Sequence, residues 1–89
     1  MGTFIKDPDA VLDYAVDWST WLPEGDTIAT STWTVPTGIT KDSDSHDDTT
    51  VTIWLSGGTL GETYELVNRV TTAAGRTDDS THIFYIREK

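Results

Sequence analysis

The chain has 89 residues and a formal net charge of −9, from 6 basic and 15 acidic side chains. This length has room for one small core, so we predict a single domain over residues 1–89. Nucleic acids and anionic membranes select for clustered lysine and arginine, so we expect neither as a partner. Cysteine is absent, which excludes disulfides, thiolate metal sites and a cysteine nucleophile. The sequence has no apolar run long enough to predict a membrane span. Residues 1–10 also lack the apolar stretch of a signal peptide.

Threonine is unusually frequent, at seventeen residues, and it is accompanied by four tryptophans and three tyrosines. β-Branched and aromatic side chains fit the surface of a pleated sheet better than that of a helix. The composition therefore predicts an all-β domain.

The first strand is expected over residues 3–6 and ends at Asp7 and Pro8. Residues 11–18 have two interpretations. Read as a strand, they place the carboxylates of Asp13 and Asp17 on one face and alternate apolar residues on the other. Read as a helix, they begin with Asp7 as the cap and Pro8 in the first turn. The alternation is the cleaner pattern, so we predict a strand.

The middle of the chain alternates strands and polar connections. A turn over residues 21–26 precedes a strand over 27–35, whose apolar residues change parity and indicate a bulge. Trp33 in this strand is expected in the core. Ile39 is expected to begin a short edge strand, and residues 41–50 are predicted to form a polar loop. Residues 51–56 then alternate, with Trp54 facing away from the apolar side.

The C-terminal third predicts a hairpin. Strands are expected over residues 63–72 and 81–86, with Gly75 in the polar reversal between them. Tyr64 follows a glycine-rich approach and fits a tyrosine corner, a feature of immunoglobulin-like sandwiches. We therefore predict an immunoglobulin-like antiparallel β-sandwich of six to seven strands, with either face of the last strand able to form a contact surface.

Chemically active sites are poorly supported. The loop with Asp42, Asp44, Asp47 and Asp48 offers oxygen ligands for calcium, but it lacks the glycine and terminal glutamate of an EF-hand. His46 and His82 are too few for a zinc site. Asp13 and Asp17 are better explained as surface charges than as an acid–base pair. We therefore predict no metal, no cofactor and no catalysis.

The tryptophans predict a contact surface. Exposed aromatic side chains either stack on sugars or anchor protein interfaces. Asn68 is the only asparagine and glutamine is absent, so residues that read sugar hydroxyls are scarce. We favour a protein interface, and its candidate residues are Trp18, Trp21, Trp54 and Tyr85.

Several segments resemble a family of small tailed-phage virion proteins, described as fiber-tail adaptors or accessory particle proteins. The resemblance rests on Lys6 to Tyr14, Asp17-Trp18-Ser19 with Trp21-Leu22, Gly25 to Ile28 and Ser31 to Val35, Trp54 to Thr59, Tyr64, Val70 to Thr72 and Gly75 to Asp78. It implies an immunoglobulin-like sandwich in a virion, assembled in the host cytoplasm, with other phage structural proteins as partners.

These expectations lead to a hypothesis about function. We predict a non-enzymatic adaptor that docks between tail or neck and fiber, in many copies within a symmetric assembly. The alternatives are a capsid decoration or cement protein, a host carbohydrate-binding module and a calcium-stabilised module.

Overall fold

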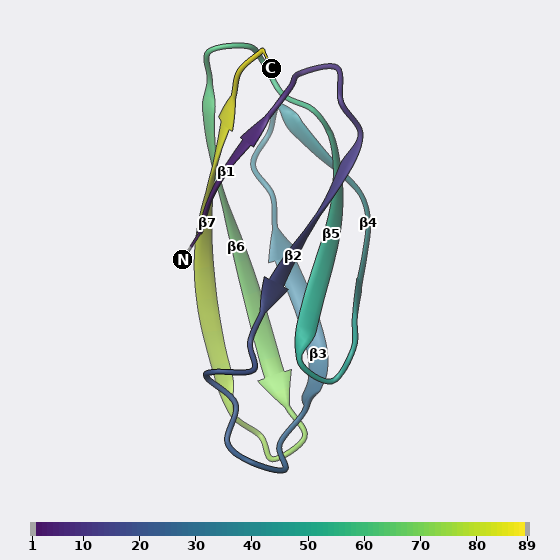
Figure 1. Cartoon of the computed structure of the whole chain (residues 1–89), viewed down its shortest axis with the longest axis vertical. Coiled ribbons are helices and arrows are strands. Elements are labelled where there is room, and N and C mark those ends of the chain that lie inside the picture. Colours follow the sequence, from purple (N-terminus) through teal and green to yellow (C-terminus); the bar gives the residue numbers. More distant parts are fainter. Residues whose placement is uncertain (1, 89) are drawn as a thin grey trace.

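The computed structural model describes residues 2–88, and within that range every regular element is a strand. The strands are β1 (Gly2–Lys6), β2 (Leu12–Asp17), β3 (Ile28–Thr34), β4 (Ile39–His46), β5 (Thr50–Gly57), β6 (Thr63–Thr72) and β7 (Thr77–Ile86). One sheet has the order β1-β7-β6-β3 and the other has the order β2-β5-β4. The two sheets face each other in an elongated sandwich of 41 × 20 × 20 Å (Figure 1). The predicted all-β immunoglobulin-like sandwich is confirmed.

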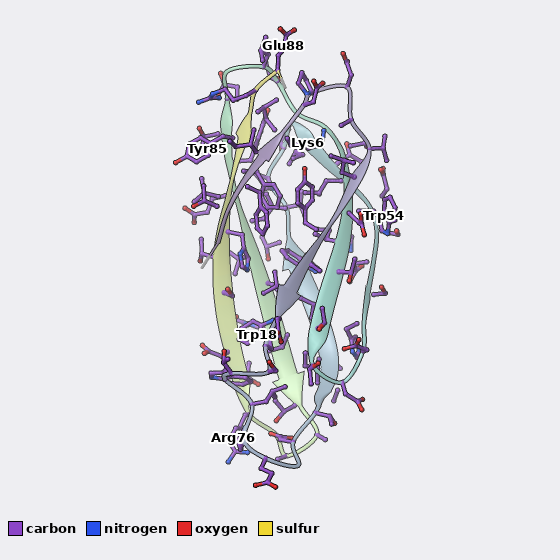
Figure 2. The ribbon with its side chains drawn as sticks, viewed as in Figure 1. Lys6, Trp18, Trp54, Arg76, Tyr85 and Glu88 are labelled. Carbon is purple, nitrogen blue, oxygen red and sulfur yellow. The ribbon has the colours of Figure 1, made fainter. Side chains whose placement is uncertain are left out.

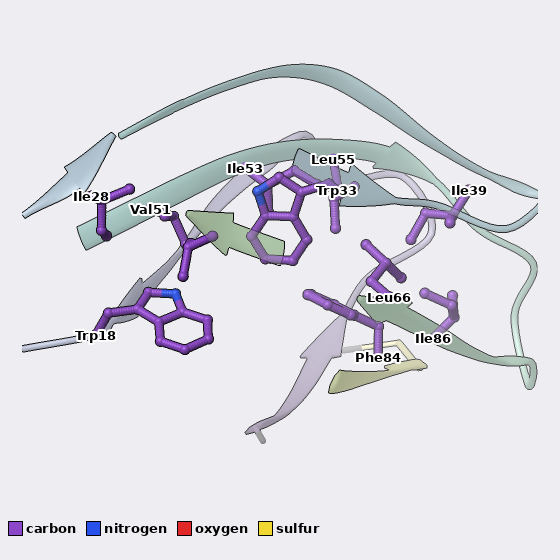
Figure 3. Packing of buried hydrophobic residues seen from close by; sticks show 11 residues of the cluster. Trp18, Ile28, Trp33, Ile39, Val51, Ile53, Leu55, Leu66, Phe84 and Ile86 are labelled. Carbon is purple, nitrogen blue, oxygen red and sulfur yellow. The ribbon is translucent and has the colours of Figure 1, made fainter. Parts of the chain in front are cut away.

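The core lies between the two sheets (Figure 3). Alternation along β5 buries every second side chain, and residues 82–86 of β7 do the same from the opposite sheet. The buried hydrophobic residues are Trp18, Ile28, Trp33, Ile39, Val51, Ile53, Leu55, Leu66, Val70, Phe84 and Ile86.

Residues 11–18 form a strand, as predicted, over Leu12–Asp17. This strand pairs antiparallel with β5, so that Tyr14 lies opposite Ile53 and Asp17 opposite Thr50. Tyr14 packs on Phe84 of the other sheet with 4.9 Å between ring centroids. In a helix, successive side chains would point in all directions around the axis, and the edge of β5 would have no strand partner.

The predicted bulge and the predicted tyrosine corner are both present. The register of β3 against β6 shifts between Ile28 and Thr30, which accounts for the change of parity before the buried Trp33. Tyr64, at the start of β6, accepts a hydrogen bond at its hydroxyl from the backbone N–H of Thr59, 3.1 Å away. The side chain thereby ties the β5–β6 connection to the sheet.

The prediction of a polar loop over residues 41–50 is wrong. Residues 39–46 form β4, which pairs along β5 with a bulge between Lys41 and Ser43, and only residues 47–49 form the turn. Aspartate and serine have low strand propensity. However, β4 is an edge strand, so its polar side chains stay at the surface while its backbone pairs with β5, and only Ile39 at its start is buried.

The last strand begins earlier than predicted, at Thr77 instead of Thr81. Polar side chains across the hairpin explain the extension. The Arg69 guanidinium donates to both carboxylate oxygens of Asp79, at 2.7 and 3.0 Å, and the hydroxyls of Thr71 and Thr77 are 3.1 Å apart. Such cross-strand pairs stabilise a hairpin without apolar residues.

One strand pair departs from the expected antiparallel pattern. β1 runs parallel to β7, with Gly2 opposite His82 and Lys6 opposite Ile86. Antiparallel pairing is required only where a tight hairpin joins two strands, and β1 and β7 lie at opposite ends of the chain.

Lys6, at the end of β1, is fully buried. Its Nζ atom donates hydrogen bonds to the backbone oxygens of Asp7 and Gly57, at 2.8 and 2.7 Å. Burial lowers the pKa of Lys6, and the nearby Asp7 and Asp42 carboxylates oppose that effect. This lysine connects β1 to the end of β5 and thus to the opposite sheet.

Candidate functional site

The four predicted contact residues lie on three different parts of the sandwich. Trp18 and Trp21 contact each other in an edge-to-face arrangement, with 5.2 Å between ring centroids. Trp54 lies on the outer face of the three-stranded sheet, and Tyr85 on the outer face of the four-stranded sheet. Figure 2 shows Trp54 and Tyr85 on opposite sides of the molecule. The four residues therefore do not form one surface.

Trp54 is 41% exposed, as expected for a side chain that faces away from the core. In the sheet it is flanked by Asp13 of β2 and Ser43 of β4. Leu12, the neighbour of Asp13, is also exposed. The outer face of this sheet thus combines one large aromatic ring with acidic and hydroxyl side chains.

Tyr85 forms part of an apolar patch on the opposite sheet. Ile5 of β1 lies beside it in register and is 50% exposed, and Ile83 follows along the same face of β7. The guanidinium carbon of Arg87 lies 5.5 Å from the centroid of the Tyr85 ring, in a cation–π contact. Aromatic, aliphatic and arginine side chains of this kind are enriched at protein interfaces.

A pocket of about 360 Å³ lies between the open edges of the two sheets, next to Trp18 and Trp21. Its lining comes from β1, β2, β7 and the β2–β3 connection: Phe4, Ala15, Val16, Asp17, Trp18, Trp21, Ser80 and His82. Trp18 is only 6% exposed, so it belongs to the core as well as to the wall of this pocket. Its position in the lower half of the sandwich is visible in Figure 2.

Asp17 and His82 both contribute to this pocket, but the alternation of β2 places the Asp17 side chain on the outer face of the sheet, whereas His82 is buried between the sheets. The backbone N–H of Ser19, 2.8 Å from Asp17 Oδ1, lowers the pKa of that carboxyl, so Asp17 is charged at pH 7. Burial lowers the pKa of His82, so its imidazole is neutral. The Nε2 atom of His82 lies 2.9 Å from the Ser80 hydroxyl, and Nδ1 has no hydrogen-bond partner among residues 2–88.

Asn68 has a structural role that its sequence position did not reveal. The side chain is fully buried and accepts a hydrogen bond from the Trp18 indole N–H, at 3.0 Å. Its amide nitrogen donates to the hydroxyl of Ser31 and the backbone oxygen of Thr32. The alternation of β6, which places Asn68 between Leu66 and Val70 on the buried face, was the available signal. Asn68 is therefore not exposed to a sugar.

The acidic residues of β4 and the following turn have separate partners. Asp44 pairs with Lys41 at 3.0 Å, Asp42 accepts from the Ser56 hydroxyl, and Asp47 accepts from the backbone N–H groups of Thr49 and Thr50. Among residues 2–88, no three histidine, cysteine, aspartate or glutamate side chains are grouped so that they could hold a metal ion. In the same range, no helix has the length and apolar character of a membrane span.

Sheet order, the buried Trp33 and the Tyr64 corner define an immunoglobulin-like β-sandwich protein with exposed aromatic patches on both sheets. Residues 6–85 match the family model described as podophage GP4 fiber-tail adaptor protein gp77, and the chain belongs to this family. No curated protein matches the chain.

Proposed function

We propose that this protein is a non-enzymatic structural component of a tailed-phage particle that docks as an adaptor between tail or neck and a fiber. The observation that carries the proposal is the family match over residues 6–85, since that family is described as a fiber-tail adaptor. In this proposal the protein is assembled in the host cytoplasm and functions in the virion, with other phage structural proteins as its partners.

The distribution of exposed aromatic residues supports docking on two sides. An adaptor contacts two different neighbours, and Trp54 and Tyr85 lie on the outer faces of opposite sheets. Interfaces derive much of their binding energy from tryptophan, tyrosine and arginine. In the proposed arrangement, one neighbour covers the Trp54 face and the other covers the patch of Ile5, Ile83, Tyr85 and Arg87.

Symmetry sets the expected number of copies. A component that joins a fiber to a tail or neck repeats around a rotational axis, so many identical copies form a closed ring. The net charge of −9 favours protein neighbours over nucleic acid or anionic lipid.

The first experiment is to measure the copy number of this protein in purified particles by quantitative mass spectrometry. A number that matches the rotational symmetry of a tail or neck is the expected result. A number that matches the capsid lattice would replace the adaptor by a capsid decoration protein. Absence from the particles would overturn the virion proposal altogether.

A carbohydrate-binding module remains the second candidate, because the pocket beside Trp18 and Trp21 combines indole rings with polar groups. The burial of Asn68 weighs against it, because the only carboxamide side chain of the protein is unavailable to sugar hydroxyls. Tryptophan fluorescence during titration with host polysaccharide tests this candidate. We expect no change, and a saturable change would favour the carbohydrate-binding module.

A further inference from the structure

The two sheets differ in how their edge strands are protected. The edges of the three-stranded sheet carry charged side chains, which are Asp13 and Asp17 on β2 and Lys41, Asp42 and Asp44 on β4. The edges of the four-stranded sheet are β1 and β3, and their one charged side chain is the fully buried Lys6. Charged side chains on an edge strand hinder its pairing with another chain. Among the described strands, only those of the four-stranded sheet lack this protection at both edges.

β3 has open backbone groups beyond its bulge. Ala73 donates its backbone N–H to Thr27, so every second residue of β6 before Ala73 faces β3. The partners of these residues are the even-numbered residues within 30–34. The backbone groups of Ser31 and Trp33 therefore point away from β6, and no backbone group within residues 2–88 is hydrogen-bonded to them.

β1 has open backbone groups at the other edge of the same sheet. Arg87 donates its backbone N–H to Lys6, so Lys6 and every second residue before it face β7. The backbone groups of Thr3 and Ile5 therefore point to the free edge, and in the described part of the chain they have no backbone partner. Thr3 and Ile5 face outward with their side chains, whereas the open groups of β3 belong to residues that face the core.

The two edges are complementary in a parallel pair. Residues side by side in such a pair direct their backbone groups to opposite sides, so a residue with open groups lies beside one whose groups are already bonded within its own sheet. An alignment of Thr32 with Thr3, and of Trp33 with Phe4, meets this condition and keeps outward side chains beside outward side chains.

The strand directions fit a rotation of one copy onto the next. β3 and β7 are both antiparallel to β6, and β1 is parallel to β7, so β1 and β3 run in the same direction. Rotation about an axis along the strands preserves that direction. A ring of copies therefore brings β3 of one copy beside β1 of the next in the parallel orientation that their open groups require.

Side chains favour contact at the four-stranded sheet and oppose it at the other. In this alignment Thr34 covers Ile5, which is 50% exposed in the single chain, and Trp33 lies beside Phe4 on the inner face. β1 and β2 lie on one side of the sandwich, and β3 and β4 on the other. The aspartates of β2 would thus approach those of β4 in the next copy, so we expect salt to strengthen the contact.

We propose that copies of this protein join head to tail through the open edges of the four-stranded sheet, with β3 of one copy in parallel pairing with β1 of the next. The inference rests on the proposed function and specifies how neighbouring copies contact each other. Because the two edges differ, the interface is heterologous and closes into a ring by repetition. The outer faces that carry Trp54 and Tyr85 remain free for other proteins of the particle.

The test is thiol cross-linking of the full-length protein, which contains no cysteine of its own. Thr3→Cys and Thr32→Cys each place one thiol at an exposed, outward-facing position of β1 or β3. The two variants, one of them labelled with ¹⁵N, are mixed at millimolar concentration in physiological salt and treated with a short bismaleimide. We expect mass spectrometry to find a dimer that contains one copy of each variant, and each variant alone to remain monomeric.

Ala15→Cys and Ser43→Cys are the matched control pair, because they are exposed positions on the charged edge strands β2 and β4. We expect the mixture of these two variants to form few cross-links. Equal yields from the two mixtures, or no cross-linking in either, would overturn the proposal. Efficient cross-linking of Thr32→Cys alone would identify two β3 strands as the pair and would also overturn it.

A second pair of variants tests the edge by charge. Thr3→Glu adds a carboxylate at the edge of β1, and Thr63→Glu adds one on the outer face of β6, inside the same sheet. By sedimentation equilibrium we expect about tenfold weaker self-association for Thr3→Glu and little change for Thr63→Glu. Equal weakening would mean that net charge, and not the β1 edge, controls association.

The result for the interface is separable from the result for the whole protein. If the particles contain this protein in the copy number of a ring but the cysteine variants do not cross-link, only the interface proposal fails. If the variants cross-link as expected but the protein is absent from particles, the proposed adaptor function fails and the interface remains.

Discussion

Buried polar side chains fix the geometry of this small core. Asn68, on β6, accepts a hydrogen bond from the indole N–H of Trp18 and donates hydrogen bonds to Ser31 and Thr32 of β3. A buried polar group that loses its partner destabilises a protein by about 1–3 kcal/mol, so such a network strongly favours one arrangement of its members. The position of Trp18, and with it one wall of the pocket, depends on this single asparagine.

His82 makes the stability of the protein depend on pH. Its pKa is lowered by burial below the ordinary value of 6.5, so the unfolded chain binds a proton more readily than the folded chain. The stabilisation that results from keeping the imidazole neutral is therefore present above pH 6.5. It is lost as the pH falls from there to the folded-state pKa.

The measurement is the free energy of unfolding by urea at pH 7.5 and at pH 5.0, for the native protein and for His82→Gln. We expect the native protein to lose more stability than the variant over this interval. The carboxylates titrate in both proteins, so their contribution cancels when the loss of unfolding free energy in the variant is subtracted from that in the native protein. Identical losses would show that His82 is protonated equally in the folded and unfolded states.

At the scale of elements, the connections between strands depend on close packing around Tyr64. Gly38 follows β3 with φ at +109°, and a Cβ atom there would lie 2.9 Å from the Tyr64 hydroxyl oxygen. Gly25, in the β2–β3 connection, has φ at +82° but no heavy atom within 4 Å of the same position. The two glycines thus share the left-handed backbone and differ in crowding.

Gly38→Ala and Gly25→Ala separate these two effects. Each should lose about 1–2 kcal/mol from backbone strain. Gly38→Ala should lose about 1–3 kcal/mol more, because the tyrosine corner must move. Unfolding in guanidinium chloride measures both values, and equal losses would mean that Tyr64 adapts without cost.

At the scale of the whole molecule, like charges dominate the surface. The structure contains three ion pairs within residues 2–88, against a formal net charge of −9 for the chain. Self-repulsion of this kind destabilises a compact state and is screened by salt over about 8 Å at physiological ionic strength.

We therefore expect the melting temperature to rise when sodium chloride is increased from about 10 mM to about 150 mM, the range over which screening grows most for exposed charges. Differential scanning calorimetry at pH 7 is the measurement. A lower melting temperature in salt would mean that attractive ion pairs outweigh repulsion, contrary to the charge count.

Sequence patterns predicted the fold class and most of the strands correctly. Alternation of apolar residues identified β2 and β5, turn residues identified the last hairpin, and Tyr64 identified the corner, because each signal is local and depends on neighbouring residues. The start of β4 at Ile39 and its edge position were predicted, but the rest of β4 and the first half of β7 were missed, because polar edge segments become strands only through pairing with a neighbour. Only the tertiary structure fixed the burial of Lys6 and His82 and the separation of Trp54 from Tyr85, whereas the alternation of β6 was already a signal for the burial of Asn68. Tertiary structure also created the pocket, because it brings together β1, β2 and β7.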